Sequence, residues 1–181
     1  MVWNYRGYSQ SQGSPSPNAL VSDGEIVVDW LRSEMKVKLL GIHGESLGGF
    51  VAANIAKNKQ LDFLCSDRTF TCVPDVVRYS FPKGFAFLFR LFTGWELATT
   101  NAYMDFTGYK LVTYDPKDDI IPTLASLQHG IVVQQVIGSD QKKGFWCFKN
   151  DKQIQSVILL CIIIPGIRII LLQINFIERR I

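Results

Sequence analysis

Histidine is scarce in this sequence, its cysteines form no recognisable motif, and these two absences argue against a metal site. The chain has only two histidines. The cysteines at positions 65, 72, 147 and 161 form neither a C-x-x-C pair nor a Cys/His spacing suited to zinc. We therefore expect no bound metal, and we interpret the cysteines as reduced thiols in a protein that faces the cytosol.

Concentrated positive charge and a secretory leader are also absent. The net charge is +3, and no dense group of Lys and Arg with interleaved aromatic residues is visible, so we expect no nucleic-acid partner. The first residues, MVWNYRGY, contain no basic region followed by an apolar run. The sequence therefore predicts no signal peptide and a cytoplasmic or membrane-associated protein. A length of 181 residues predicts at most one domain with a real core.

Strand and helix patterns alternate through the first 137 residues. Helical spacing, preceded by a Ser22-Asp23 cap, indicates a helix at residues 25–34, and further helices are expected at 47–57, within 74–103 and at 122–128. Strands are expected at residues 2–5, 37–42, 61–65, 110–114 and 131–137. Such alternation predicts an α/β fold, a mostly parallel sheet with helices on both faces and right-handed crossovers.

One short motif between a predicted strand and a predicted helix carries chemistry. Residues 44–48, GESLG, match the G-x-S-x-G nucleophile elbow. Gly44 and Gly48 would remove side chains that clash where the strand reverses into the helix. Ser46 would then project its hydroxyl above the sheet, and the N–H of Leu47 at the helix start could stabilise an oxyanion. A plain glycine-rich turn is the alternative interpretation.

Three segments, in the right order and spacing, resemble the α/β-hydrolase fold of serine hydrolases, in the small esterase and serine-aminopeptidase-like branch. They are NYRGYSQSQGSPSP before the elbow helix, SDRTF at residues 66–70 after the next strand, and DPKDDIIP at residues 115–122. The resemblance spans residues 2–137. It implies hydrolysis of an ester, thioester or amide in a small-molecule or acyl substrate, without a metal or organic cofactor.

The resemblance also implies a catalytic acid after the next-to-last strand. Matching the family's D-E-x-I-P turn to residues 118–122 selects Asp118, with Asp119 as the weaker candidate and Asp115 nearby. Such an acid would orient a histidine and stabilise its cation. Alternatively, these aspartates only cap the helix that Pro122 would begin.

The expected catalytic base is where the sequence departs from the family. The family's histidine would lie near residues 138–140, and none stands there. His43, on the strand entering the elbow, is interpreted as a packed strand residue. His129 is a weak candidate base, because we expect it in the last turn of a helix that stops at Gly130. Without a base, Ser46 is a weak nucleophile.

The two ends of the chain also depart from the family. The strands and the H-G-type oxyanion loop that precede the N-Y-R-G-Y strand have no counterpart, so we expect the first strands of the sheet to be missing. We divide the chain into a partial hydrolase domain at 1–140 and a divergent hydrophobic tail at 141–181. Residues 156–177 are almost wholly apolar and long enough to cross a bilayer. Alternatively they form a buried or aggregating tail, or core strands around Pro165-Gly166.

Two functional hypotheses follow. The first is a serine hydrolase, with impaired turnover, that forms an acyl-enzyme at Ser46. The second is a non-catalytic hydrolase-like protein with a membrane-associated C-terminus. The aromatic-rich residues 81–95 would either shape an acyl pocket or form the core of a lid.

Overall fold

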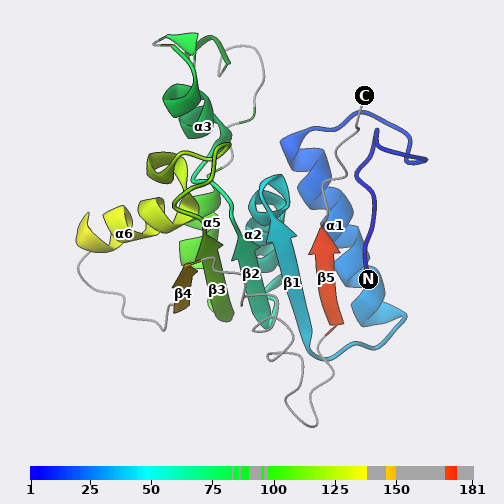
Figure 1. The fold of residues 1–181 in the computed structure, drawn as a ribbon. Coiled ribbons are helices and arrows are strands. Elements are labelled where there is room, and N and C mark those ends of the chain that lie inside the picture. Colours follow the sequence, from blue (N-terminus) through cyan, green and yellow to red (C-terminus); the bar gives the residue numbers. More distant parts are fainter. Residues whose placement is uncertain are drawn as a thin grey trace.

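The computed structural model describes residues 1–82, 84–85, 87–89, 95, 98–137, 146–149 and 170–174. Helices and strands alternate through most of this part of the chain (Figure 1). The elements are α1 (Pro17–Ser33), β1 (Leu40–Glu45), α2 (Leu47–Lys59), β2 (Phe63–Asp67), α3 (Val73–Ser80), α5 (Thr99–Asp105), β3 (Tyr109–Tyr114), the 3₁₀ turn η1 (Thr123–Ala125), α6 (Leu127–Ile137), β4 (Trp146–Lys149) and β5 (Ile170–Ile174).

The strands form one five-stranded sheet in the order β4-β3-β2-β1-β5. All four pairings between neighbours are parallel, and the arrowheads in Figure 1 accordingly point the same way. The predicted parallel sheet with helices around it is confirmed. Because the strands are parallel, every loop that follows a strand emerges at one edge, which we call the carboxyl edge. Helix α3 lies beyond this edge in Figure 1.

Helix α2 forms the centre of the core. It packs on β1 and β2, while α1 and α5 pack against it. Its small and apolar residues Phe50, Ala52, Ala53 and Ala56 are all fully buried. The α1–α2 contact is close, because a Cβ on Gly24 would lie 2.2 Å from Cδ1 of Ile55. The small residues of α2 therefore let it pack tightly.

The strand predicted at residues 2–5 is wrong. Residues 1–39 contain no strand of the sheet, so β1 is its first strand in chain order. Tyr5 is instead buried in the core, and Nε of Arg6 donates a 2.7 Å hydrogen bond to Asp23 Oδ2 on α1. Asp23 does not cap α1, because the helix begins earlier, at Pro17, with Ser16 as its N-cap.

The helix predicted at 122–128 and the strand predicted at 131–137 are also wrong. A short 3₁₀ turn is followed by α6, which runs through Gly130 to Ile137. Gly130 does not end this helix. The reason for a glycine at this position is packing, since a Cβ there would lie 2.4 Å from Thr71 Cγ2. Ile131 is fully buried while Val132 and Val133 are exposed, which suits one buried helix face.

The strands predicted at 37–42 and 61–65 occur two to three residues later than expected, as β1 and β2. The strand predicted at 110–114 is confirmed as β3. Within the helical stretch predicted at 74–103, the structure has α3 and α5.

The predicted tail falls largely outside the described residues. Within it, only β4 and β5 are described, and β5 supplies five residues of the candidate membrane segment at 156–177. Among the helices of the described ranges, none combines the length and apolarity that crossing a bilayer requires.

Candidate active site

Ser46 has a strained backbone at the point where β1 turns into α2. Its φ is 51° and its ψ is −119°, a region that residues with a Cβ rarely adopt. Such strain persists only where the surroundings impose it, and it concentrates at functional sites. The side chain is half-buried and makes no capping hydrogen bond to α2. Ser46 is therefore held in a strained conformation at the turn from β1 into α2.

Hydrogen bonds from the loop after β2 impose this conformation. The N–H of Ser46 donates to the carbonyl of Asp67 at 2.9 Å, and Thr69 Oγ1 donates to the carbonyl of Ser46 at 2.6 Å. The N–H of Gly49 donates to the same carbonyl at 3.0 Å. Both backbone polar groups of Ser46 are thus satisfied in the strained geometry.

Close backbone approaches explain two glycines around the serine. A Cβ on Gly44 would lie 2.1 Å from the carbonyl oxygen of Gly48, inside any permitted contact. A Cβ on Gly49 would lie 2.6 Å from Cβ of Thr69. Gly44 is required because the first turn of α2 crosses directly over β1, and Gly48 supplies the backbone that approaches it. Gly49 is required by the loop after β2, which carries Thr69.

Leu47 is the first residue of α2, so its N–H has no acceptor within the helix. It is adjacent to Ser46 and lies at the positive end of the α2 dipole. Those two properties are what an oxyanion donor needs.

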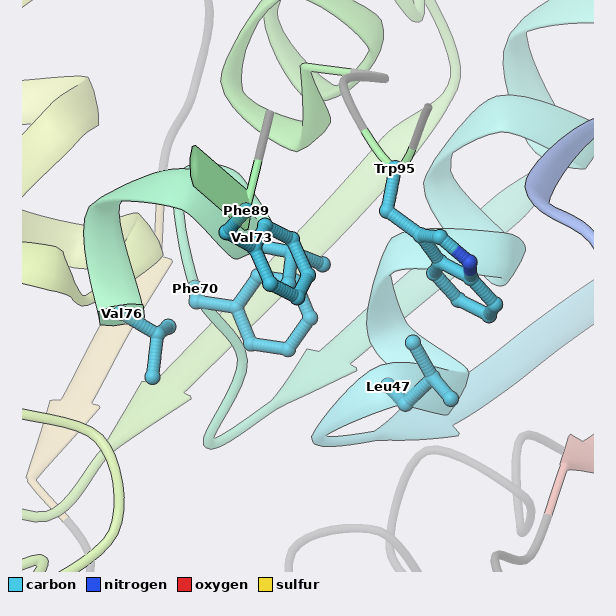
Figure 2. Close-up of a pocket in the computed structure, with 6 residues that line it drawn as sticks. All are labelled: Leu47, Phe70, Val73, Val76, Phe89 and Trp95. Carbon is cyan, nitrogen blue, oxygen red and sulfur yellow. The ribbon is translucent and has the colours of Figure 1, made fainter. Parts of the chain in front are cut away.

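An apolar pocket of about 330 Å³ opens next to this turn. Figure 2 shows Leu47 and Trp95 together on one side and Val76 on the opposite side. Phe89 and Trp95 come from the aromatic-rich residues 81–95, so this stretch does help to form a pocket. All its lining side chains are apolar: Leu47, Phe70, Val73, Val76, Phe89 and Trp95.

Asp118 follows β3 at the carboxyl edge of the sheet. Its Oδ1 accepts hydrogen bonds from the N–H groups of Ile120 at 2.8 Å and Ile121 at 2.9 Å. The carboxylate is half-buried, and these two bonds fix its orientation. Asp115 is engaged in the same way with the N–H of Lys117 at 2.9 Å, whereas Asp119 is exposed. Because β1 and β3 run parallel in one sheet, Ser46 and Asp118 belong to the same edge.

His43 lies within β1 and is buried, as expected of a strand residue. Its Nε2 is 3.9 Å from Oδ2 of Asp67, which is too long for a hydrogen bond but close enough for electrostatic interaction. Burial raises the pKa of Asp67, but nearby His43, the hydrogen bond from Thr113 and the positive charge of Arg68 outweigh it and hold the pKa below its usual range. Arg68 also forms an ion pair with Glu45. These polar residues brace the ends of β1, β2 and β3.

His129 lies in the first turn of α6 and not in the last turn of a helix, so that prediction is wrong. Its N–H donates to Ser126 Oγ at 3.2 Å, which places it just behind the helix start. The start of α6 is bound to the loop after β2, because the N–H of Leu127 donates to the carbonyl of Thr69 at 2.9 Å. Within the described residues, the His129 side chain makes no hydrogen bond to Ser46 or Asp118.

The part played by Thr69 and Phe70 was not found from the sequence. Their segment, SDRTF, attracted attention only through its resemblance to the family. In the structure Thr69 holds Ser46, and Phe70 lines the pocket. Their position directly after a buried strand that neighbours β1 was the signal that could have identified them.

Known proteins with similar sequences are α/β-hydrolase proteins, although no family model matches the chain. Protein bem46 of Schizosaccharomyces pombe is 36% identical over 97 residues, covering 51% of this chain and 32% of that protein. The α/β-hydrolase domain-containing protein WAV2 of Arabidopsis thaliana is 32% identical over 44% of this chain and 27% of its own. Lysophosphatidylserine lipase ABHD12 of Danio rerio is 37% identical over 32% of this chain and 15% of its own. The matched part thus spans a third or less of these relatives.

Solved structures with the same fold are also α/β hydrolases. An α/β hydrolase from Vibrio vulnificus matches with a TM-score of 0.66 at 16% identity, covering 87% of this chain and 61% of that one. An esterase from Pyrococcus furiosus matches with a TM-score of 0.58 at 15% identity, covering 87% and 64%. The chain therefore has an α/β-hydrolase fold, and its resemblance to α/β-hydrolase proteins is confirmed.

Proposed function

We propose that this chain is a serine hydrolase, in which Ser46 forms an acyl-enzyme with an ester, thioester or amide that carries an apolar acyl group. The strained conformation of Ser46 carries this proposal. Three hydrogen bonds hold this serine at φ 51°, and a plain glycine-rich turn would not require a strained serine held in this way. The likeness to esterase and lipase proteins supports the same reaction class.

In the proposed reaction, Ser46 Oγ attacks the acyl carbonyl and the N–H of Leu47 stabilises the oxyanion that forms. Collapse of this intermediate releases the alcohol, thiol or amine with a proton, and water then hydrolyses the acyl-enzyme. The apolar pocket begins at the Leu47 side chain, directly beside the attacked carbon, so it is suited to the acyl group. A pocket without polar lining groups disfavours charged acyl groups.

Asp118 would act as the positioning acid, because Ile120 and Ile121 already fix one of its oxygens and the other is available for an imidazole. His129 is the candidate base, since His43 is buried against Asp67. His129 makes no hydrogen bond to Ser46 or Asp118 within the described residues, so we expect slow turnover. The same observation favours the second candidate function, a hydrolase-like protein without catalysis.

Covalent labelling with a fluorophosphonate separates the two functions, because the probe reacts only with an activated serine. We expect slow labelling of the full chain, measured over hours by intact mass. Ser46→Ala should abolish it, and Ser22→Ala, which alters an exposed serine on α1, should leave the labelling rate unchanged. Labelling that is slowed in His129→Ala would identify the base.

Two results would reject the hydrolase. One is a chain that takes up no label while its unfolding transition shows that it is folded. The other is labelling that survives Ser46→Ala. Either result would leave the non-catalytic function as the better account of the elbow.

A further inference from the structure

Five large apolar side chains within residues 79–88 are exposed, in a segment that lies between the pocket-lining residues Val76 and Phe89 in the sequence. Phe87 is 69% exposed, and the others are 44–52% exposed. Two of them, Phe81 and Phe85, stack with ring centroids 5.3 Å apart. We call this set the aromatic patch; its members are Tyr79, Phe81, Phe85, Phe87 and Leu88.

The patch is too large to be an ordinary scatter of apolar surface residues. Half-exposed aromatic side chains present about 100 Å² each, so five residues within a ten-residue segment present on the order of 500 Å². Contiguous apolar surfaces of that size on a soluble protein usually mark a binding site for another protein or a membrane.

Charge indicates which of these occupants fits. Between Asp75 and Glu96, residues 76–95 contain three basic residues and no acidic one. Asp75 itself accepts a hydrogen bond from the Thr71 hydroxyl. Of the basic residues, Arg78 is exposed on α3 and lies over the ring of Tyr79, 5.8 Å from its centroid. Exposed aromatic side chains combined with basic ones and without acidic ones suit the boundary of an anionic lipid bilayer.

The patch and part of the pocket are formed by neighbouring residues of the same segment. On α3, Val76 lines the pocket and Tyr79 follows it by one helical turn into solvent. Next to Leu88 of the patch, Phe89 lines the pocket. Figure 1 places α3 beyond the carboxyl edge, away from the body of the sheet. Helix α3, which carries Tyr79, therefore projects from the sheet in this view.

We propose that the aromatic patch docks this chain on the surface of an anionic phospholipid bilayer, with the mouth of the pocket facing the lipid. Apolar rings enter the boundary between headgroups and acyl chains, while Arg78 pairs with lipid phosphates. This docking needs no catalysis by Ser46, so it stands or falls independently of the proposed function.

Flotation with vesicles tests the docking directly. The full chain is mixed with vesicles of phosphatidylcholine alone or of phosphatidylcholine with phosphatidylserine, and the bound fraction is measured after density centrifugation. We expect binding that rises several-fold with phosphatidylserine and falls with added salt. The double variant Phe85→Ser/Phe87→Ser should lower the partition coefficient at least about tenfold.

A matched variant controls for general loss of apolar surface. Ile26 and Trp30 are 63% and 44% exposed on α1, so Ile26→Ser/Trp30→Ser removes similar groups far from the patch and should bind vesicles like the parent chain. Circular dichroism and the melting midpoint should confirm that both double variants are folded.

Three results would overturn the proposal. The first is a parent chain that does not float with the vesicles. The second is vesicle binding that persists in Phe85→Ser/Phe87→Ser. That second result would assign the membrane contact to another segment such as residues 156–177. The third is a parent chain that does not bind vesicles but associates with itself through the patch. In that case the parent chain would elute from gel filtration earlier than Phe85→Ser/Phe87→Ser. Repeating the flotation with Ser46→Ala should change nothing, whichever way the labelling experiment ends.

Discussion

Thr69 Oγ1 donates a 2.6 Å hydrogen bond to the carbonyl oxygen of Ser46, so the loop after β2 holds the strained residue at the end of β1. The two residues are 23 positions apart, and the parallel pairing of β1 with β2 brings them together. The conformation of the candidate nucleophile is therefore a property of two neighbouring strands, and it can be tested from either one.

Thr69→Val removes this hydroxyl and keeps the shape of the side chain. We expect a loss of about 1–2 kcal/mol in the free energy of unfolding, because Thr69 is 2% exposed and one acceptor loses a donor in a closed site. We also expect slower fluorophosphonate labelling at Ser46. Urea unfolding and labelling rates measure the two effects.

Thr99→Val is the matched control for this change. Thr99 is fully buried, and its hydroxyl has no hydrogen-bond partner among the described residues. Removing that hydroxyl should leave stability unchanged or raise it slightly. Equal destabilisation by both substitutions would show that the hydrogen bond to Ser46 adds nothing measurable to the free energy of unfolding.

Replacing Ser46 itself should separate backbone strain from chemistry. Glycine tolerates a φ of 51° whereas alanine does not, and both replacements remove the hydroxyl. We expect Ser46→Gly to be more stable than Ser46→Ala by about 1 kcal/mol in denaturant unfolding, with labelling absent from both. A glycine variant that is less stable than the alanine variant would contradict the strain described at this turn.

Gly44→Ala should be among the most damaging single substitutions in the chain. The new Cβ would lie 2.1 Å from the carbonyl oxygen of Gly48, and neither β1 nor the first turn of α2 can move without losing buried contacts. We expect a loss of about 3 kcal/mol or more in unfolding free energy. Gly84→Ala is the comparison, because a Cβ there meets nothing within 4 Å and only its φ of 95° opposes the change, at a cost of about 1 kcal/mol.

Acid should weaken the support that Asp67 gives to the strand ends. Its folded pKa lies below the unfolded value, so its contribution to stability is fully present above the unfolded pKa and is lost as the pH falls through the folded one. Asp67→Asn should therefore be less stable than the parent chain at pH 7, and the difference should shrink below about pH 4. Unfolding free energies from pH 7 down to pH 3 measure this convergence.

Asp29→Asn serves as the surface comparison for Asp67. Asp29 is 59% exposed and pairs with Lys59 at 2.6 Å, so its loss should change stability by less than about 1 kcal/mol. A parallel pH dependence in the two variants would show that the buried cluster around Asp67 contributes no more than an exposed pair.

The sequence by itself determined the class of the fold and the position of the turn that holds Ser46, because both depend on local patterns. Apolar strands alternating with helical periodicity favour a parallel sheet, and the crossovers between its strands favour the right-handed form. Gly44 and Ser46 could be identified from the sequence, because a sharp strand-to-helix turn requires small residues at fixed spacing.

What the sequence could not determine depends on contacts between distant segments. Gly130 looked like a helix stop, but tertiary packing against Thr71 and Thr100 makes it the interior of α6, and that change moved His129 from the end of a helix to its beginning. Residues 2–5 had the composition of a strand, but the burial of Tyr5 and the ion pair between Arg6 and Asp23 bind them to α1 instead.

The pocket and the conformation of Ser46 also depend on contacts between distant segments. Leu47, Phe70 and Trp95 come from three separate parts of the chain, and no local pattern records that they line one cavity. The elbow motif named Ser46, but Asp67 and Thr69 hold it in its conformation, and they reach it only because β2 lies beside β1. Local spacing thus selects the candidate residue, while hydrogen bonds across neighbouring strands decide its geometry.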